Sequence, residues 1–176
     1  MKTSFASSIL PLALSLFSST STATPISSRQ TGQFNIQLYT PTYFGHSTSP
    51  YQNQYLFISG NELVSKVSSD GAAVAFFDGD ELKFDTEDGV WALQIPSSTG
   101  PVTVSDAEGT GDVVYDYTSG QPGIWSSDSN FGAWYMCPGL GDDDLPRLFV
   151  IMGDDGYSDL PDVGCGAVRL EKKSLT

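Results

Sequence analysis

Histidine, cysteine and basic residues are scarce in this chain, and each scarcity excludes a class of chemistry. The chain has two cysteines and one histidine, His46, which does not lie near them, so a four-ligand zinc site is excluded. A serine or cysteine triad would need His46, but this residue lies in a loop-like Gly/Ser/Thr/Pro stretch, and no Gly-x-Ser-x-Gly motif exists. P-loop and zincin motifs are also absent. The sequence by itself therefore indicates no particular reaction.

Basic residues number 8 against 21 acidic ones, which gives a formal net charge of −13. A surface of this sign repels nucleic acid and anionic membranes, so we expect neither as a partner. The same charge keeps a secreted protein soluble and apart from its own copies. The oligomeric state is left open by the sequence.

Residues 1–23 have the pattern of a secretory signal peptide. Lys2 supplies the positive charge, residues 9–17 (ILPLALSLF) form the apolar segment, and Ser21-Thr22-Ala23 places small residues before the expected cleavage. The apolar segment is under half the length of the about 20 residues that a transmembrane helix needs. We therefore expect a secreted protein, located outside the cell or in a cell wall.

The mature chain is expected to begin at or after Thr24. A flexible Ser/Thr-rich leader would occupy 24–33, and a single domain would occupy 34–176. About 150 residues suit one domain and can bury a sizeable core.

Helical periodicity is missing from the chain, while Gly and Pro interrupt it at intervals of strand length. Two similar units, 56–63 (LFISGNEL) and 75–82 (AFFDGDEL), each place a Gly-Asn or Gly-Asp pair between apolar strands, as a tight hairpin requires. We expect a single compact all-β domain of about ten short antiparallel strands, folded as a sandwich or a barrel. The repeated hairpin also makes a β-trefoil an option.

The C-terminal quarter of the chain is expected to form the core. The run Leu148–Met152 is apolar without interruption, which is typical of a central strand buried on both faces. Cys137 and Cys165 lie on either side of it, and two cysteines in an exported chain most often pair. Closing a loop of this length stabilises a fold by about 3–4 kcal/mol. Trp91 and Trp134 are also expected in the core.

The segment between the two cysteines is strongly acidic. It contains seven aspartates, namely Asp142, Asp143, Asp144, Asp154, Asp155, Asp159 and Asp162. We interpret them first as solvated acidic turns. One alternative is a weak calcium site at Asp154, Asp155 and Asp159, because calcium takes oxygen ligands from flexible loops. The other is a pair of catalytic carboxylates, as in a glycosidase. No other cofactor is expected.

Aromatic residues gather in the early part of the chain. The group consists of Tyr39, Tyr43, Phe44, Tyr51 and Tyr55. Exposed flat rings can stack on the faces of sugars, and cell-wall polysaccharide is a natural neighbour of a secreted protein. The alternative is that these rings pack in the core, as large rings in β-domains commonly do.

A series of short motifs in the C-terminal part of the chain resembles one family. In order, they are Asp78–Leu82 (DGDEL), Val104–Asp106, Gly109–Gly111, Tyr117–Gly120 (YTSG), Trp134, Cys137-Pro138, and Cys165-Gly166 followed by Ala167–Glu171. Taken in this order, over roughly residues 55–171, they are similar to the PhiA-like family of fungal secreted cell wall proteins and related IgE-binding fungal proteins. This chain has two cysteines where those relatives carry more.

The resemblance implies a non-enzymatic protein of the fungal cell wall or extracellular matrix. We expect a structural or adhesive role for it, with the aromatic group in contact with glycan. The alternative is a freely secreted interaction protein that acts on a host, as an effector or an allergen does. A carboxylate glycosidase is a distant third. The resemblance transfers no catalytic residue to this chain.

Overall fold

The structure is a computed structural model that describes residues 32–41, 49–110, 113–117, 122–139, 143–154, 156–161 and 164–175. The expected signal peptide and most of the leader lie outside these residues, as does His46.

The described chain consists of β-strands and one short 3₁₀-helix, without an α-helix. The strands are β1 (Phe34–Tyr39), β2 (Tyr55–Ser59), β3 (Glu62–Lys66), β4 (Val74–Asp78), β5 (Glu81–Thr86), β6 (Gly89–Gln94), β7 (Gly100–Pro101), β8 (Thr103–Ser105), β9 (Val113–Asp116), β10 (Gly123–Ser126), β11 (Phe131–Cys137), β12 (Arg147–Met152) and β13 (Gly166–Ser174); the 3₁₀-helix is η2 (Gly156–Asp159). The all-β prediction is confirmed.

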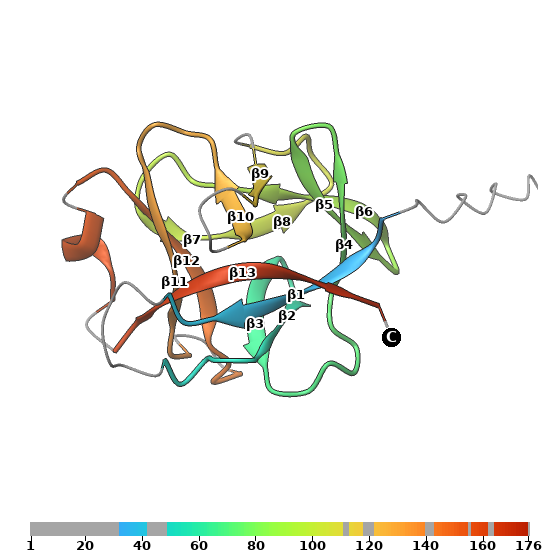
Figure 1. Ribbon diagram of the computed structural model, residues 1–176, viewed down its shortest axis with the longest axis horizontal. Helices are drawn as coiled ribbons and strands as arrows, with labels where there is room; N and C mark the ends of the chain where they lie inside the picture. Colours follow the sequence, from blue (N-terminus) through green and yellow to red (C-terminus); the bar gives the residue numbers. More distant parts are fainter. Residues whose placement is uncertain are drawn as a thin grey trace, which may run out of the picture.

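Nine of these strands form a closed antiparallel barrel, in the order β1-β4-β5-β6-β8-β3-β12-β11-β13 and back to β1. The first and last strands close it, because β1 pairs with β13 from Phe34 opposite Ser174 to Tyr39 opposite Arg169. These two strands run side by side in Figure 1. Strand β2 bridges β1 and β3, β7 pairs with β12, and β10 and β9 extend the sheet beyond β13. Of the two predicted architectures, the barrel is therefore the one that forms.

Both predicted hairpins form with two-residue turns. Ser59 pairs with Glu62 across Gly60-Asn61, and Asp78 pairs with Glu81 across Gly79-Asp80. The glycines have φ of 62° and 61°, whereas neither Asn61 nor Asp80 has positive φ. Positive φ at the first turn residue alone defines a type II′ turn, whose twist matches that of the paired strands. A residue with a Cβ would be strained in either position.

Strand β12 is buried over its whole length. Leu148, Val150 and Met152 point into the main core inside the barrel. Phe149 and Ile151 point to the opposite side, where they belong to a second, smaller cluster. The prediction of a central strand buried on both faces is confirmed, because the wall of the barrel is itself covered from outside at this place.

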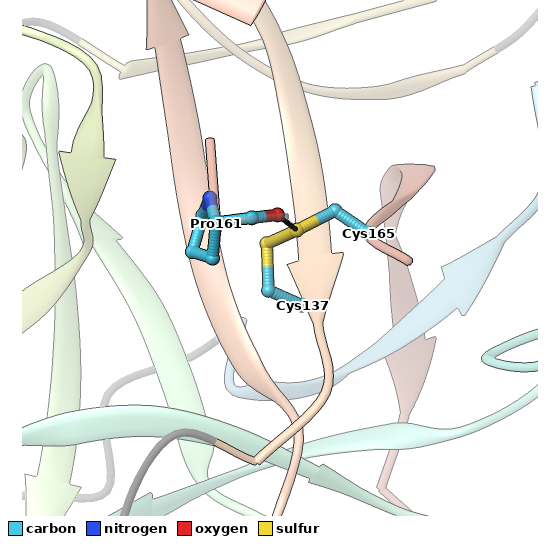
Figure 2. Close-up of a disulfide and its surroundings, with 3 residues drawn as sticks. All are labelled: Cys137, Pro161 and Cys165. Atoms are coloured by element: carbon cyan, nitrogen blue, oxygen red, sulfur yellow. Dashed lines mark hydrogen bonds between the residues drawn. A yellow bond between two sulfur atoms is a disulfide. The ribbon is translucent and has the colours of Figure 1, made fainter. Parts of the chain in front are cut away.

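The cover is the 3₁₀-helix η2 with Leu160 and Pro161, which follow β12 inside the disulfide-closed loop. Cys137 ends β11, and its disulfide partner Cys165 stands directly before β13. The sulfur of Cys165 lies 3.6 Å from the carbonyl oxygen of Pro161, as Figure 2 shows. Tyr135 and both cysteines pack with Phe149 and Ile151, and Leu160 covers them. The predicted disulfide is confirmed, and it holds a lid of chain over the outer face of β12.

Arg147, at the start of β12, is 9% exposed and fixes this region by charge. Its Nε donates to Glu62 on β3 at 2.5 Å, and one terminal nitrogen donates to Asp143 at 3.0 Å. The other donates to the carbonyl of Leu145 at 3.2 Å. Charge-assisted bonds of this kind compensate the desolvation of a buried guanidinium. Arg147 therefore ties β12 to β3 and to the acidic segment before it.

The disulfide should contribute measurably to stability. Replacing Cys137 and Cys165 together by Ala is expected to lower the free energy of unfolding by about 3–4 kcal/mol, because the unfolded chain regains the entropy of an open loop. Urea denaturation of the oxidised wild type and the double variant measures this difference. An unchanged midpoint in the double variant would show that the covalent closure adds nothing to the noncovalent packing.

Candidate functional site

A lysine continues the inward face of the closing strand. Val168 and Leu170 on β13 are buried in the barrel core, and Lys172 is the next residue on the same face. In the strand register Lys172 lies opposite Ile36 of β1, which is also a core residue. Directly opposite residues of an antiparallel pair share a face. The ammonium group of Lys172 is therefore held where an apolar side chain would be expected.

Three aromatic rings from three different strands surround this ammonium. The Nζ atom lies 4.3 Å from the ring centre of Tyr115 on β9, 4.5 Å from that of Phe77 on β4 and 5.0 Å from that of Phe34 on β1. The rings of Phe34 and Phe77 also stack, with centres 5.7 Å apart. We call Phe34, Phe77, Tyr115 and Lys172 the aromatic cage.

Two opposing effects act on the charge of Lys172. Burial lowers the pKa of its ammonium, because desolvation disfavours the charged form. The negative faces of the three rings attract the cation, at roughly 0.5–2 kcal/mol for each contact. Burial also raises the pKa of Tyr115, and the nearby charge of Glu171 raises it further. The cage therefore combines a hydrogen-bonding ammonium with aromatic walls.

One ring beside the cage is open to solvent. Tyr117, directly after β9, is 72% exposed, and its ring meets that of Tyr115 edge-on with centres 4.5 Å apart. Contact with Tyr115 limits the freedom of this ring while leaving most of it accessible. A flat exposed ring beside hydrogen-bonding groups can stack on the apolar face of a sugar and bond its hydroxyls. Tyr117 and the cage together form the candidate site.

The aromatic group predicted to contact glycan is not assembled on one exposed surface. Tyr51 is 5% exposed and belongs to the core, so the expectation that its ring is available for stacking is wrong. Tyr39 is half-buried beneath the guanidinium of Arg169, 5.6 Å from it, and Tyr55 packs against a small apolar cluster. The two remaining members, Tyr43 and Phe44, lie outside the described residues.

The predicted calcium ligands are only partly described. Asp154 and Asp159 are exposed, and Asp155 lies outside the described residues. Within the described chain, no group of three or more side chains is placed to hold a metal ion. The carboxylate of Asp143 is engaged within the protein, because it accepts hydrogen bonds from Arg147 and Ser59. The calcium interpretation therefore gains no support from these side chains.

Two described carboxyl groups have a clearly shifted pKa, and in both the shift makes the group less suited to act as an acid. The Lys83 side chain lowers the pKa of Glu81, and the backbone N–H of Leu145 lowers that of Asp143, with smaller contributions from Ser59 and Arg147. The general acid of a glycosidase needs the opposite shift, upward.

The residues of this site are far apart in the chain, so no sequence motif predicts it. The cage joins residues from β1, β4, β9 and β13, which no local pattern connects. One local signal was present, since Lys172 interrupts the apolar alternation begun by Val168 and Leu170. Two tryptophans were predicted to lie in the core. Trp134 is fully buried there, and Trp91 is partly buried against it.

A scan against protein-family models found no match, and searches of curated proteins and of solved structures found none either. In the part of the chain that the structure describes, no helix is long and apolar enough to cross a membrane.

The packing of the cage can be tested by replacing its lysine. Lys172→Ala is expected to lower the free energy of unfolding by about 2 kcal/mol, because it leaves a gap among the rings. The lost cation–π attraction is largely offset, because the desolvation of the ammonium is relieved at the same time. Lys172→Met should lose less than half of this, because its thioether fills the same space and contacts the rings favourably. Thermal or urea denaturation compares the two variants. Equal losses in both would show that the ammonium rather than the packing dominates.

Proposed function

We propose that this chain is a secreted, non-enzymatic protein of the fungal cell wall or extracellular matrix, with a structural or adhesive role, that contacts polysaccharide through Tyr117 and the adjoining cage. The observation that carries the proposal is the exposed ring of Tyr117, which is 72% accessible and braced by Tyr115. A large aromatic side chain that is exposed to solvent, yet held in place by a neighbouring ring, is suited to contact a ligand.

The surroundings of Tyr117 favour a neutral glycan. Lys172 lies against the supporting Tyr115 ring, and its ammonium can donate hydrogen bonds to hydroxyls. The carboxylate of Glu171 is also near Tyr115, where it pairs with Arg169. The net charge of −13 opposes the approach of polyanions, including acidic polysaccharides. Chitin, β-glucan and mannan are therefore the polymers we propose as ligands.

Four features of the chain support a location outside the cell and a role without catalysis. The N-terminal 23 residues have the composition of a signal peptide, and the disulfide suits an oxidising compartment. The described carboxyls with shifted pKa, Glu81 and Asp143, are shifted downward by their partners. The ordered motifs that resemble the PhiA-like family favour the same assignment.

The test is cosedimentation of the protein with insoluble chitin, β-glucan and mannan. The wild type should bind at least one polymer, and Tyr117→Ala should bind it about 5- to 10-fold more weakly, because aromatic stacking contributes roughly 1 kcal/mol. Tyr117→Phe keeps the ring and should retain most of the binding.

The matched control is Tyr157→Ala, which removes another exposed tyrosine, 52% accessible, from η2 on a different element. This variant should bind as the wild type does. Absence of binding by the wild type to all three polymers would contradict the glycan role and favour a freely secreted protein. An equal loss in both alanine variants would show that the contact is not specific to Tyr117.

A further inference from the structure

A polar cavity of about 240 Å³ lies between the β10–β11 turn and the end of β12. It is lined by Ser129, Asn130, Phe131, Gly132, Gly153 and Asp154. None of these residues belongs to the aromatic cage or to the disulfide lid. The cavity is therefore a second feature of the surface, separate from Tyr117.

The walls of the cavity are held in place by backbone bonds. The N–H of Asn130 donates to the carboxylate of Asp128 at 2.8 Å, and the N–H of Phe131 donates to the carbonyl of Asp128 at 3.0 Å. The N–H of Gly153 donates to the carbonyl of Asn130 at 2.6 Å, which joins the two sides. This turn is therefore fixed before a ligand arrives, and preorganisation reduces the entropy lost on binding.

The polar side chains of the cavity are free for a ligand. Within the described chain, the side chains of Ser129, Asn130 and Asp154 have no hydrogen-bond partner, and all three are exposed. They provide a hydroxyl, an amide that both donates and accepts, and a carboxylate that accepts two bonds. Such groups match a ligand that carries several adjacent hydroxyls.

The lining of the cavity is mainly polar, and Phe131 supplies its small apolar part. The ring of Phe131 is half-buried and is braced edge-on by Trp134, with centres 4.8 Å apart, and by Trp125 at 6.2 Å. The backbone of Gly132 lies close to Ile151, since a Cβ there would lie 3.1 Å from a methyl group of that residue. A sugar ring presents hydroxyls at its edge and C–H groups on its faces, so it can use both kinds of wall.

We infer that this cavity binds a single neutral sugar residue, such as the end of a glycan chain. The carboxylate of Asp154 accepts bonds from neighbouring hydroxyls, the amide of Asn130 bonds a third, and Phe131 contacts the ring. The volume of about 240 Å³ is below the roughly 300–1,000 Å³ of sites for larger ligands, and it suits one sugar ring. The choice of ligand class rests on the proposed glycan role, but the site uses separate residues.

Other ligands fit the cavity less well. Calcium needs about six to eight oxygens, and Asp154 is the only carboxylate among the lining residues. An anion would be repelled by Asp154 and by the net charge of −13.

The experiment is a titration of the isotope-labelled full mature protein with glucose, N-acetylglucosamine and mannose, followed by amide NMR shifts. At least one sugar should produce saturable shifts confined to 129–132 and 153–154, in the millimolar range, without added metal. Asn130→Ala and Asp154→Ala should each weaken this binding at least 5-fold. Asp88→Ala removes an exposed carboxylate from the β5–β6 turn and should change nothing.

Several results would overturn the inference. These are the absence of localised shifts with all three sugars, shifts that disappear with a chelator, and stronger shifts with a simple alkylammonium ion than with any sugar. Tyr117→Ala separates this inference from the proposed function, because this variant should keep the monosaccharide shifts while its binding to polysaccharide is weakened. Retained polymer binding without monosaccharide shifts would reject the cavity alone.

Discussion

The burial of β12 on both faces is the constraint on which the rest of the structure depends. Burying a large apolar side chain contributes about 1.5–3 kcal/mol, so a strand that buries all of its residues needs two covers. The barrel provides one cover, around Leu148 and Val150. The region of η2 and Leu160, which the disulfide holds in place, provides the other, over Phe149 and Ile151. Arg147 is the polar end of this strand, and its ion pairs with Glu62 and Asp143 join the two covers.

Closure of the barrel links this core to the surface features. Because β1 pairs with β13, the ring of strands is complete only when the beginning and the end of the domain meet. The aromatic cage is built at this junction, with Phe34 from the first strand and Lys172 from the last. A lysine can lie at the end of an apolar core, because its stem is apolar and the faces of the aromatic rings attract its ammonium group. The ammonium can still donate hydrogen bonds to polar groups. The candidate contact surface is therefore a consequence of how the fold closes.

The features that the sequence predicted are those set by neighbouring residues. The II′ turns followed from Gly60 and Gly79, the central strand followed from the unbroken apolar run, and the disulfide followed from a single available pair. Each depends on local conformation or on simple counting. The strand order of the barrel does not, because it depends on pairings between residues far apart in the chain.

The candidate sites depend on the same long-range pairings, which explains why they were not predicted. Tyr51 was expected at the surface because it lies in a polar stretch, but it packs in the core beside Gly166, where a Cβ would lie 3.5 Å from its ring. Tyr117 was noted only in the YTSG motif of the family resemblance, since nothing near it in sequence shows that its ring contacts Tyr115 beside Lys172. Aromatic composition indicates that rings are available, whereas exposure is decided by the tertiary fold.

Native-state hydrogen exchange tests the central claim, that β12 is covered separately from its two sides, most directly. The amides of Leu148–Met152 should exchange more slowly than those of β9 and β10, which extend beyond the closed ring. Reduction of the disulfide should accelerate exchange in 156–161 while the β4–β5–β6 region keeps its protection. Exchange in β12 as fast as in β9, or uniform loss of protection on reduction, would contradict a strand with two independent covers.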